Sequence, residues 1–238
     1  MGNLEKLFER YDALVVLDTE TTGLRWDRDQ IIEFAAVRLE KRQGEIVTVQ
    51  EYDELIALAP GTILPYKITE LTGIRPEDLR DRGISKTRVC RDIAELLSGE
   101  KTLILAYNAH FDLCFLFYTL RRDGDAAVLR GKDKLDLLTV YRDRHGYPHR
   151  LENAISTYGL EDQVQNSHRA IDDVKATVEV MRAMEAEKED LDRYINLFGY
   201  IRKYGIGGKP IGSVTYVPQD YEPGIPAYER VPQTAGQV

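Results

Sequence analysis

Two carboxylates separated by a single residue follow the first apolar run of the chain. Asp18 and Glu20 lie in the segment DTETTG, directly after the apolar residues 13–17. Side chains at positions i and i+2 of a strand point to the same face, so these two carboxylates could share one cation. The alternative is a strand-end acid that pairs with an arginine or a lysine. In either case, a carboxylate at the end of a buried strand needs a positive partner.

A second pair of polar residues follows another apolar run, at residues 102–107. The segment YNAHFD places Asn108 and Asp112 at the start of an expected helix. Asparagine is a common N-cap residue, and an aspartate in the first turn interacts favourably with the helix dipole. Both residues therefore have a structural interpretation beside the functional one.

The third segment, HRAIDD, opens the last long helical pattern, at residues 168–186. Asp173 borders the apolar positions of this helix, whereas Asp172 lies about 100° around the helix axis and is expected to face water. His168 stands at the helix start, where an ordinary surface histidine is the alternative interpretation.

Together the three segments supply four carboxylates and one histidine, a set that suits phosphodiester hydrolysis. Hard divalent cations prefer oxygen ligands, and two ions about 4 Å apart can stabilise both the attacking and the leaving oxygen of a phosphoryl transfer. Mg²⁺ keeps several waters and is completed by substrate phosphate, so four carboxylates suffice for two ions. A histidine, which titrates near neutral pH, is suited to take the proton of the attacking water.

The elements that must position these residues follow one another in an informative order. Apolar or β-rich runs predict strands at 13–18, 30–39, 45–58, 102–107 and the start of 134–142, with Gly44 in a hairpin turn. Helical spacing of apolar residues occurs at 87–98, 110–122, 151–158 and 168–186, while 60–78 is expected to be mostly loop with one helical turn. This order predicts an α/β protein with a mixed sheet, whose first three strands are antiparallel and whose faces carry helices.

The composition excludes several classes of protein. With 238 residues, 43% hydrophobic and 30% charged, the chain is typical of a soluble globular protein rather than a disordered, collagen-like or membrane protein. No apolar run approaches the roughly 18 residues that span a bilayer. Two cysteines are too few for a disulfide framework or a zinc site, and the N-terminus lacks the order of a signal peptide, so we expect a cytoplasmic protein.

The charge distribution bears on the kind of substrate. A formal net charge of -8 argues against a general polyanion binder, although residues 80–150 hold fourteen Lys and Arg against ten Asp and Glu. Acids that hold a divalent metal would make the acidic total compatible with a phosphate-bearing substrate.

The three segments, in this order, resemble the motifs of the DEDDh group of 3′–5′ exonucleases, the family of the proofreading epsilon subunits of bacterial DNA polymerase III. The segments from Asp18 to Gly23 and from Asn108 to Asp112 are similar to the first two motifs, and His168 with four residues before Asp173 is similar to the third. The resemblance covers about residues 11–186, including ITELTGI at 68–74 and KLDLL at 134–138. A sister branch has tyrosine four residues before the last aspartate; here that position is Arg169, which favours the histidine version.

The resemblance implies a fold, a cofactor and a role for the acids. The family has an RNase H-like fold with a mixed five-stranded sheet. By resemblance, two Mg²⁺ ions, which Mn²⁺ can replace, are bound by Asp18, Glu20, Asp112 and Asp173. His168 is the general base, and Asp172 is a surface difference from relatives rather than a fifth ligand.

The resemblance also implies a substrate site, formed by Thr22, Gly23, Leu24, Asn108 and Phe111. The backbone around Thr22 and Gly23, with Leu24, resembles the part that receives the 3′-terminal nucleotide, and Phe111 is placed to touch its base. For Leu24 and Phe111, ordinary core packing is the alternative.

Beyond the resemblance, the chain changes character. We expect an exonuclease domain at 1–190, followed at 191–238 by a C-terminal helix and a Gly/Pro-rich extension that is not an independent domain. The stretch YINLF at 194–198 is faintly similar to sliding-clamp-binding peptides, but Tyr194 replaces the usual leading glutamine. A helix that packs by its apolar face is therefore favoured there.

These observations predict a metal-dependent 3′–5′ exonuclease that releases nucleoside 5′-monophosphates from single strands, with DNA favoured. An RNA-trimming or oligoribonucleotide exonuclease uses the same metal chemistry and is the alternative. A second class is a binding subunit associated with a DNA polymerase or sliding clamp, with little turnover, although a binder has no need of four carboxylates. A structural Ca²⁺ site is a third class, but its ligands usually come from one local loop.

Overall fold

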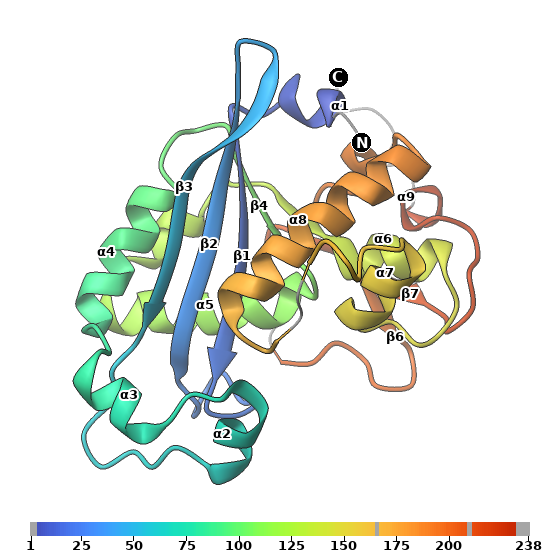
Figure 1. The fold of residues 1–238 in the computed structure, drawn as a ribbon. Helices are drawn as coiled ribbons and strands as arrows, with labels where there is room; N and C mark the ends of the chain where they lie inside the picture. The colour runs from blue at the N-terminus through green and yellow to red at the C-terminus, as the bar shows by residue number, and fades with distance from the viewer. Residues whose placement is uncertain (1–3, 165–166, 209–210, 232–238) are drawn as a thin grey trace.

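A five-stranded mixed sheet runs through the centre of the molecule (Figure 1), in the order β3-β2-β1-β4-β5. The computed structural model describes residues 4–164, 167–208 and 211–231. The three N-terminal strands pair antiparallel, and the two others join in parallel. The strands are β1 (Ala13–Thr21), β2 (Ile31–Arg42), β3 (Glu45–Leu55), β4 (Thr102–Ala106) and β5 (Lys134–Asp136). The predicted α/β class and mixed sheet are confirmed.

Helices cover both faces of this sheet, with α4 and α5 on one face and α8 on the other (Figure 1). The helices are α1 (Glu5–Phe8), α2 (Tyr66–Thr72), α3 (Pro76–Asp81), α4 (Lys86–Leu96), α5 (Ala109–Asp123), α6 (Leu137–Arg144), α7 (Leu151–Thr157), α8 (Ala170–Glu187) and α9 (Ala227–Arg230). Single 3-10 turns are formed by Ala126–Leu129 and Leu191–Tyr194. Within the described residues, no helix combines the length and the apolar character that crossing a membrane requires.

The first strand is apolar without interruption because both of its faces are buried. Leu14 and Val16 pack in the cluster that includes α8, whereas Val15 and Leu17 pack in the cluster that includes α4 and α5. The even-numbered residues of β1 therefore face α8. This parity continues to the polar end of the strand, so Asp18 and Glu20 emerge on the α8 side of the sheet.

Local backbone signals explain the turns and the one under-predicted region. The β2–β3 hairpin turns at Gln43 and Gly44, which have φ of 53° and 87°, as the glycine there predicts. The segment 60–78, expected to be mostly loop with one helical turn, contains more helix than that, namely α2 and the start of α3. Gly73 ends α2 with φ of 72°, and Pro76 begins α3, both of which are common helix-boundary residues.

The prediction of a C-terminal helix is wrong over residues 197–201. These residues form strand β6 (Leu197–Ile201), which pairs in parallel with β7 (Thr215–Gln219). Asn196 holds the start of β6 against β5, since its side chain accepts a 2.9 Å hydrogen bond from the backbone N–H of Lys134. Tertiary pairing thus overrides a helical pattern that is only five residues long. Tyr194 and Phe198 are each 1% exposed, so the segment similar to a clamp-binding peptide is buried in this structure.

Candidate active site

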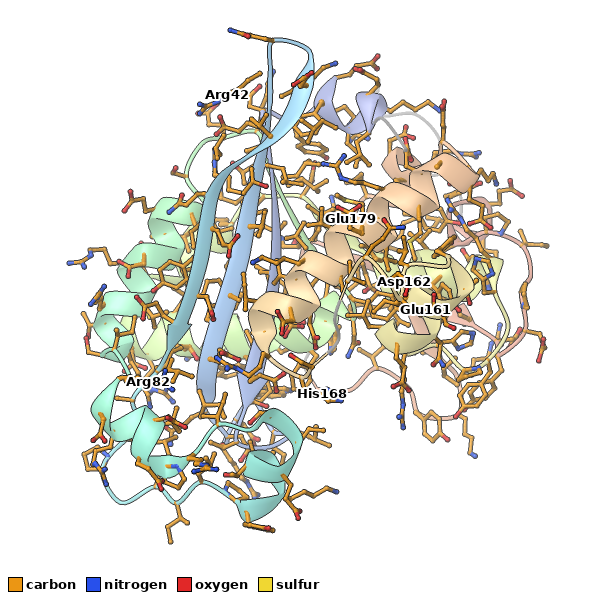
Figure 2. The ribbon with its side chains drawn as sticks, viewed as in Figure 1. Arg42, Arg82, Glu161, Asp162, His168 and Glu179 are labelled. Carbon is orange, nitrogen blue, oxygen red and sulfur yellow. The ribbon has the colours of Figure 1, made fainter. Side chains whose placement is uncertain are left out.

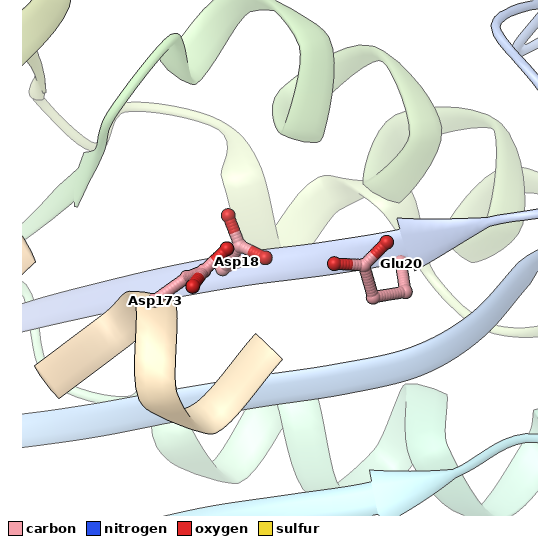
Figure 3. Close-up of side chains that lie close together, drawn as sticks. All are labelled: Asp18, Glu20 and Asp173. Carbon is pink, nitrogen blue, oxygen red and sulfur yellow. The ribbon is translucent and has the colours of Figure 1, made fainter. Parts of the chain in front are cut away.

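Three of the four predicted acids meet where β1 ends beside the first turn of α8. Asp18 and Glu20 come from β1 and Asp173 comes from α8, as Figure 3 shows. Carboxylate oxygens of these three residues lie within 4.8 Å of one another. The fold thereby brings together Asp18 and Asp173, which are 155 positions apart in the chain. Three carboxylates at this spacing require a positive partner when they are ionised.

The start of α8 is held in place by Glu33, a buried acid on β2 that sequence reasoning did not select. Its carboxylate accepts a 2.8 Å hydrogen bond from Nε of Arg169 and a 2.9 Å hydrogen bond from the backbone N–H of Ala170. Glu33 is 0% exposed, so it is a fully buried charge that caps the first turn of the helix carrying Asp173. A glutamate in the otherwise apolar run IIEFAAV was the signal that could have found it.

Burial and mutual repulsion raise the pKa of all three carboxyl groups in the protein without metal. The pKa of Asp18 lies well above its ordinary value because burial disfavours its charged form and because Asp112 and Asp173 repel it. Burial and then repulsion from Asp173 raise the pKa of Glu20 to about 8. Burial, with repulsion from Asp172, raises the pKa of Asp173 to about 7. The site disfavours its own ionised form.

Asp112 reaches the same strand end from α5, on the opposite face of the sheet. It is 2% exposed, and its Oδ1 accepts a 2.7 Å hydrogen bond from the hydroxyl of Thr19. Burial raises the pKa of Asp112 to about 7, against the opposing effect of the hydrogen bond from Thr19. Asp112 lies outside the group of three, yet its charge is felt by Asp18.

The residues present fit a divalent cation. Oδ1 of Asp173 is inaccessible to solvent and has no hydrogen-bond partner among the described residues. A buried carboxylate oxygen without a donor is costly unless a cation or an ordered water satisfies it. The donors of this group are carboxylate oxygens that lie within 4.8 Å of one another. Oxygen ligands of this kind suit Mg²⁺, Mn²⁺ and Ca²⁺.

His168 lies at the end of α8 that carries Asp173, and Figure 2 labels it there. The residue is exposed and has a left-handed backbone, with φ of 55°. It is therefore not packed against the acids, but stands two residues before the helix begins at Ala170. Asp172, on the same helix, accepts a 2.5 Å hydrogen bond from the hydroxyl of Ser167 and is not a member of the acidic group.

The loop after β1 places three of the predicted substrate-binding residues. Thr22 is buried and its hydroxyl accepts a 3.0 Å hydrogen bond from the backbone N–H of Gln30. Gly23 sits so close to Asp29 that an added Cβ would lie 2.4 Å from a carboxylate oxygen, so a side chain there would displace Asp29. Leu24 is 83% exposed, which rules out core packing as the reason for this apolar residue.

Leu24, Asn108 and Phe111 line one cavity of about 660 Å³, which none of the four acids lines. Asn108 stands at the N-cap position of α5 but makes no capping hydrogen bond with its side chain, and its φ is 71°. The N-cap interpretation therefore does not account for it. Phe111 is partly buried, 4.9 Å from the ring of Phe115, so one part of it packs in the core while another faces the cavity.

Two further residues that the sequence did not single out position the second motif. Asp136 is 3% exposed, and its carboxylate accepts a 2.9 Å hydrogen bond from the backbone N–H of Ala109 at the start of α5. His110 is hydrogen-bonded through Nδ1 to the hydroxyl of Tyr216, at 2.8 Å, and through Nε2 to the carbonyl oxygen of Gly207. The sequence could have indicated Asp136, because it is an acid between leucines in the segment KLDLL. It could not have indicated the contacts of His110, whose partners lie about a hundred positions away in the chain.

Comparisons with known proteins agree with this geometry. The RNase_T family model, described as exonuclease, matches residues 15–181. The chain is 34% identical over 178 residues to the DNA polymerase III PolC-type of Bacillus subtilis, covering 73% of this chain but 11% of that protein. It is 30% identical over 181 residues to the DNA polymerase III subunit epsilon of Treponema pallidum, covering 73% of this chain and 77% of that one.

Among solved structures, E. coli exonuclease I in complex with a dT13 oligonucleotide matches with a TM-score of 0.67 at 24% identity, over 77% of this chain and 43% of that one. This likeness shows the fold, which is the RNase H-like fold that the motifs imply. The chain spans less than half of exonuclease I and about a tenth of the PolC-type protein.

Proposed function

The chain belongs to the RNase_T exonuclease family, and from this premise we propose that it is a metal-dependent 3′–5′ exonuclease that releases nucleoside 5′-monophosphates from single-stranded DNA. The single observation that supports this most is the convergence of Asp18, Glu20 and Asp173 within 4.8 Å at the end of β1. Such a group is unstable without a cation, and a cation there serves phosphodiester hydrolysis.

Asp18, Glu20 and Asp173 would hold the divalent ions, and Asp112 joins them from the other face of the sheet. When bound, two Mg²⁺ or Mn²⁺ ions supply Lewis-acid stabilisation of the charge that develops on the phosphate. The carboxylates must be ionised to act as ligands, so the raised pKa values of these groups mean that metal binding releases protons.

His168 takes the proton of the attacking water in this proposal. Its exposed position leaves the imidazole free to approach a substrate phosphate from the solvent side of the acids. The water oxygen then forms a bond to phosphorus while the bond from phosphorus to the 3′ oxygen of the preceding nucleotide breaks. The products are one nucleoside 5′-monophosphate and a strand that is shorter by one nucleotide.

The substrate residues are assigned from their places in the cavity. Leu24 offers an exposed apolar surface, and Phe111 offers part of a ring, both suited to contact a base. Thr22 and Gly23 hold the loop that carries Leu24, and Asn108 can hydrogen-bond to a sugar or base. DNA is favoured because the relatives are DNA polymerase III proteins and exonuclease I is solved with dT13.

The test is digestion of 5′-labelled single-stranded DNA and RNA of the same sequence by the purified full chain. We expect a ladder that shortens from the 3′ end in Mg²⁺ or Mn²⁺, faster on DNA, and no shortening in EDTA. Asp18→Asn should lower the rate by about 10³-fold or more, because it removes a ligand that is central to the acidic group. His168→Ala should lower it by about 10²-fold, the usual contribution of a general base.

The matched control is Asp162→Asn, which neutralises an exposed aspartate away from the site and should leave the rate unchanged. Intact strands of both kinds in either metal would contradict the proposal. Faster trimming of RNA than of DNA would retain the chemistry and overturn the preference for DNA.

Association with a DNA polymerase is a further part of the proposal, supported by the epsilon subunit of Treponema pallidum, most of whose length this chain covers. Co-purification with a polymerase subunit in stoichiometric amounts, retained in Asp18→Asn, would establish it. Recovery of the chain alone under the same conditions would leave it a stand-alone nuclease.

A further inference from the structure

A second cavity adjoins the one that Leu24, Asn108 and Phe111 line. The first, of about 660 Å³, and the second, of about 750 Å³, share four lining residues: Asn108, Arg142, Ile201 and Tyr204. We call the two together the C-terminal groove. It begins at Leu24 and Phe111, where the terminal nucleotide is proposed to bind, and leads away from the acids to the residues around Tyr147 and Tyr221.

One wall of this groove is built by the part of the chain that lies beyond the family match, which ends at residue 181. Residues 199–201 and 203–208, together with Tyr216 and Tyr221, contribute this wall. His110 holds it in place through its hydrogen bonds to Tyr216 and Gly207. The extension is thus docked onto the segment that carries Asn108, Phe111 and Asp112, and it shapes a surface that the matched family region alone does not form.

Arg142 lines both cavities and forms no hydrogen bond or ion pair with the described residues. Its Nε is buried without an acceptor, and the carboxylate of Asp136 attracts the guanidinium without contacting it. Arg144, on the same helix, contrasts with it, since it pairs with Asp190 at 2.6 Å and with Glu187 at 3.0 Å. A partly buried guanidinium that lines a cavity and has no anion in contact is suited to bind a phosphate.

Exposed aromatic rings stand around this cation. Tyr147 and Tyr204 are each 68% exposed and Tyr221 is 37% exposed. The rings of Tyr147 and Tyr221 lie 5.6 Å apart, and Tyr204 lines the same cavity as these two. The ammonium of Lys203 lies 5.2 Å from the ring centre of Tyr204. Aromatic rings interleaved with cations are the surface on which single strands stack their bases.

We propose that the C-terminal groove binds the single strand on the 5′ side of the nucleotide being removed, with Arg142 on a backbone phosphate and Tyr147 and Tyr204 stacked on bases. This inference rests on the proposed exonuclease function and extends it, because it assigns to the C-terminal extension the recognition of strand length. The groove also gives an acidic protein, of net charge -8, a local cationic path for a polyanion.

The experiment measures binding separately from hydrolysis. Fluorescence anisotropy in EDTA gives the affinity of the full chain for 5′-labelled dT3, dT12 and U12, and the same chain is assayed for hydrolysis in Mg²⁺. We expect dT12 to bind at least tenfold more tightly than dT3. In Arg142→Gln and in Tyr204→Ala this ratio should fall about tenfold, the size of one lost phosphate or stacking contact.

Salt dependence separates the two kinds of contact. For dT12, the slope of log affinity against log salt should fall by about 0.7 in Arg142→Gln and stay unchanged in Tyr204→Ala, because only the former loses a phosphate contact. Arg142→Lys, which keeps the charge, should restore most of the slope. Arg42→Gln is the matched control; Figure 2 shows Arg42 at the tip of the β2–β3 hairpin, far from the groove, and this variant should behave as the unchanged protein.

Two results would overturn the inference. One is an unchanged length preference in Arg142→Gln and Tyr204→Ala; the other is equal affinity of the parent chain for dT3 and dT12, which would leave the groove to a protein partner. Tyr204 is exposed, so its loss cannot be ascribed to misfolding. Absence of hydrolysis with the length preference intact would contradict the proposed function but not this inference. Comparison of dT12 with U12 shows whether the groove prefers DNA or RNA.

Discussion

At the scale of single residues, the site is defined by charges that the protein alone does not neutralise. Asp18, Glu20 and Asp173 crowd together, Asp112 adds its charge through the sheet, and Glu33 is already engaged by Arg169. Burial comes first among the causes of each raised pKa, and like-charge repulsion adds to it. The folded protein without metal therefore stores an electrostatic cost that a divalent cation can relieve.

This cost predicts how stability depends on pH. Because the folded pKa values of Glu20, Asp112 and Asp173 are raised to about 7 or 8, the folded state binds more protons than the unfolded state between about pH 4 and 8. Stability of the metal-free protein must then fall as pH rises through this window. We expect a Tm lower by several degrees at pH 8.5 than at pH 5.5, at roughly 2–4 °C per kcal/mol. Thermal melts in EDTA measure it.

Two additions make the pH prediction specific. Mg²⁺ or Mn²⁺ should raise the Tm at pH 8.5 by more than at pH 5.5, because only the ionised carboxylates bind the metal. Asp173→Asn should flatten the pH dependence in EDTA, whereas Asp162→Asn should leave its slope as it is. A metal-free Tm that rises from pH 5.5 to 8.5 in the parent chain would contradict the raised pKa values.

At the scale of elements, the decisive arrangement is the docking of the first turn of α8 against β1 and β2. Asp173 can reach Asp18 only because Glu33 of β2 binds both Arg169 and the backbone N–H of Ala170. The helix start is thus positioned by a sheet residue, and the ligand geometry depends on an ion pair that does not touch the substrate. Asp136 performs the same task for the start of α5.

Removal of Glu33 should therefore disturb a site that it does not line. In saturating Mg²⁺, Glu33→Ala is expected to lower the free energy of unfolding by about 2–4 kcal/mol, because a buried helix N–H and a guanidinium lose their acceptor. The affinity for Mg²⁺ should fall with it, as Asp173 moves from its place. Denaturant melts and a metal titration followed by Tm measure the two effects.

Glu40 offers a matched control on the same strand. Like Glu33, it forms ion pairs with arginine, in this case with Arg38 and Arg42. It lies toward the hairpin end of β2, however, and its side chain is 26% exposed. Glu40→Ala should cost less than about 1 kcal/mol, as is usual for exposed pairs, and leave metal affinity unchanged. Equal effects of the two substitutions on metal affinity would show that Glu33 has no positioning role.

At the scale of the whole molecule, the C-terminal extension is part of the core. Leu191, Tyr194 and Val217 belong to the cluster on the α8 side of the sheet, and Phe198 belongs to the cluster on the other side. The family match ends at residue 181, nine residues before the boundary predicted at residue 190. In packing terms, however, the chain crosses that boundary on both faces of the sheet.

A chain ended after Glu189 should consequently fail to form a stable fold. The loss of four large buried side chains, at about 1.5–3 kcal/mol each, is comparable to the entire stability of an ordinary domain. These side chains are Leu191, Tyr194, Phe198 and Val217. Circular dichroism and thermal melts of the shortened chain measure this, and a cooperative transition near the Tm of the full chain would show that residues 1–189 fold alone.

A pair of single substitutions tests the same point without truncation. Phe198→Ala should destabilise the full chain by about 3–5 kcal/mol, since the side chain is 1% exposed. Phe117→Ala removes an equal volume from a ring that is 40% exposed and should cost distinctly less. Equal losses in the two variants would argue against the burial of β6.

The sequence by itself determined the fold class and the family. Continuous apolar runs predicted the central strands, and helical spacing predicted α4, α5, α7 and α8 to within a few residues, because these patterns depend on burial that is repeated along each element. The motif spacing also selected Asp18, Glu20 and Asp173, which the structure brings together. Their roles as ligands, and that of His168 as base, remain predictions for the experiments above.

Only the tertiary structure decided what depends on contacts between distant segments. In the sequence, Glu33, Asp136 and Arg142 are ordinary charged residues. The structure shows that the first two bind the N–H groups at helix starts, and that Nε of Arg142 is buried without a partner among the described residues. The segment 197–201 became a strand because β7, which begins fourteen residues after β6 ends, was available to pair with it. Local periodicity records which side of an element is buried, but it carries no information about which remote group lies there. The acidic site was therefore accessible from the sequence, whereas the groove that leads to it was not.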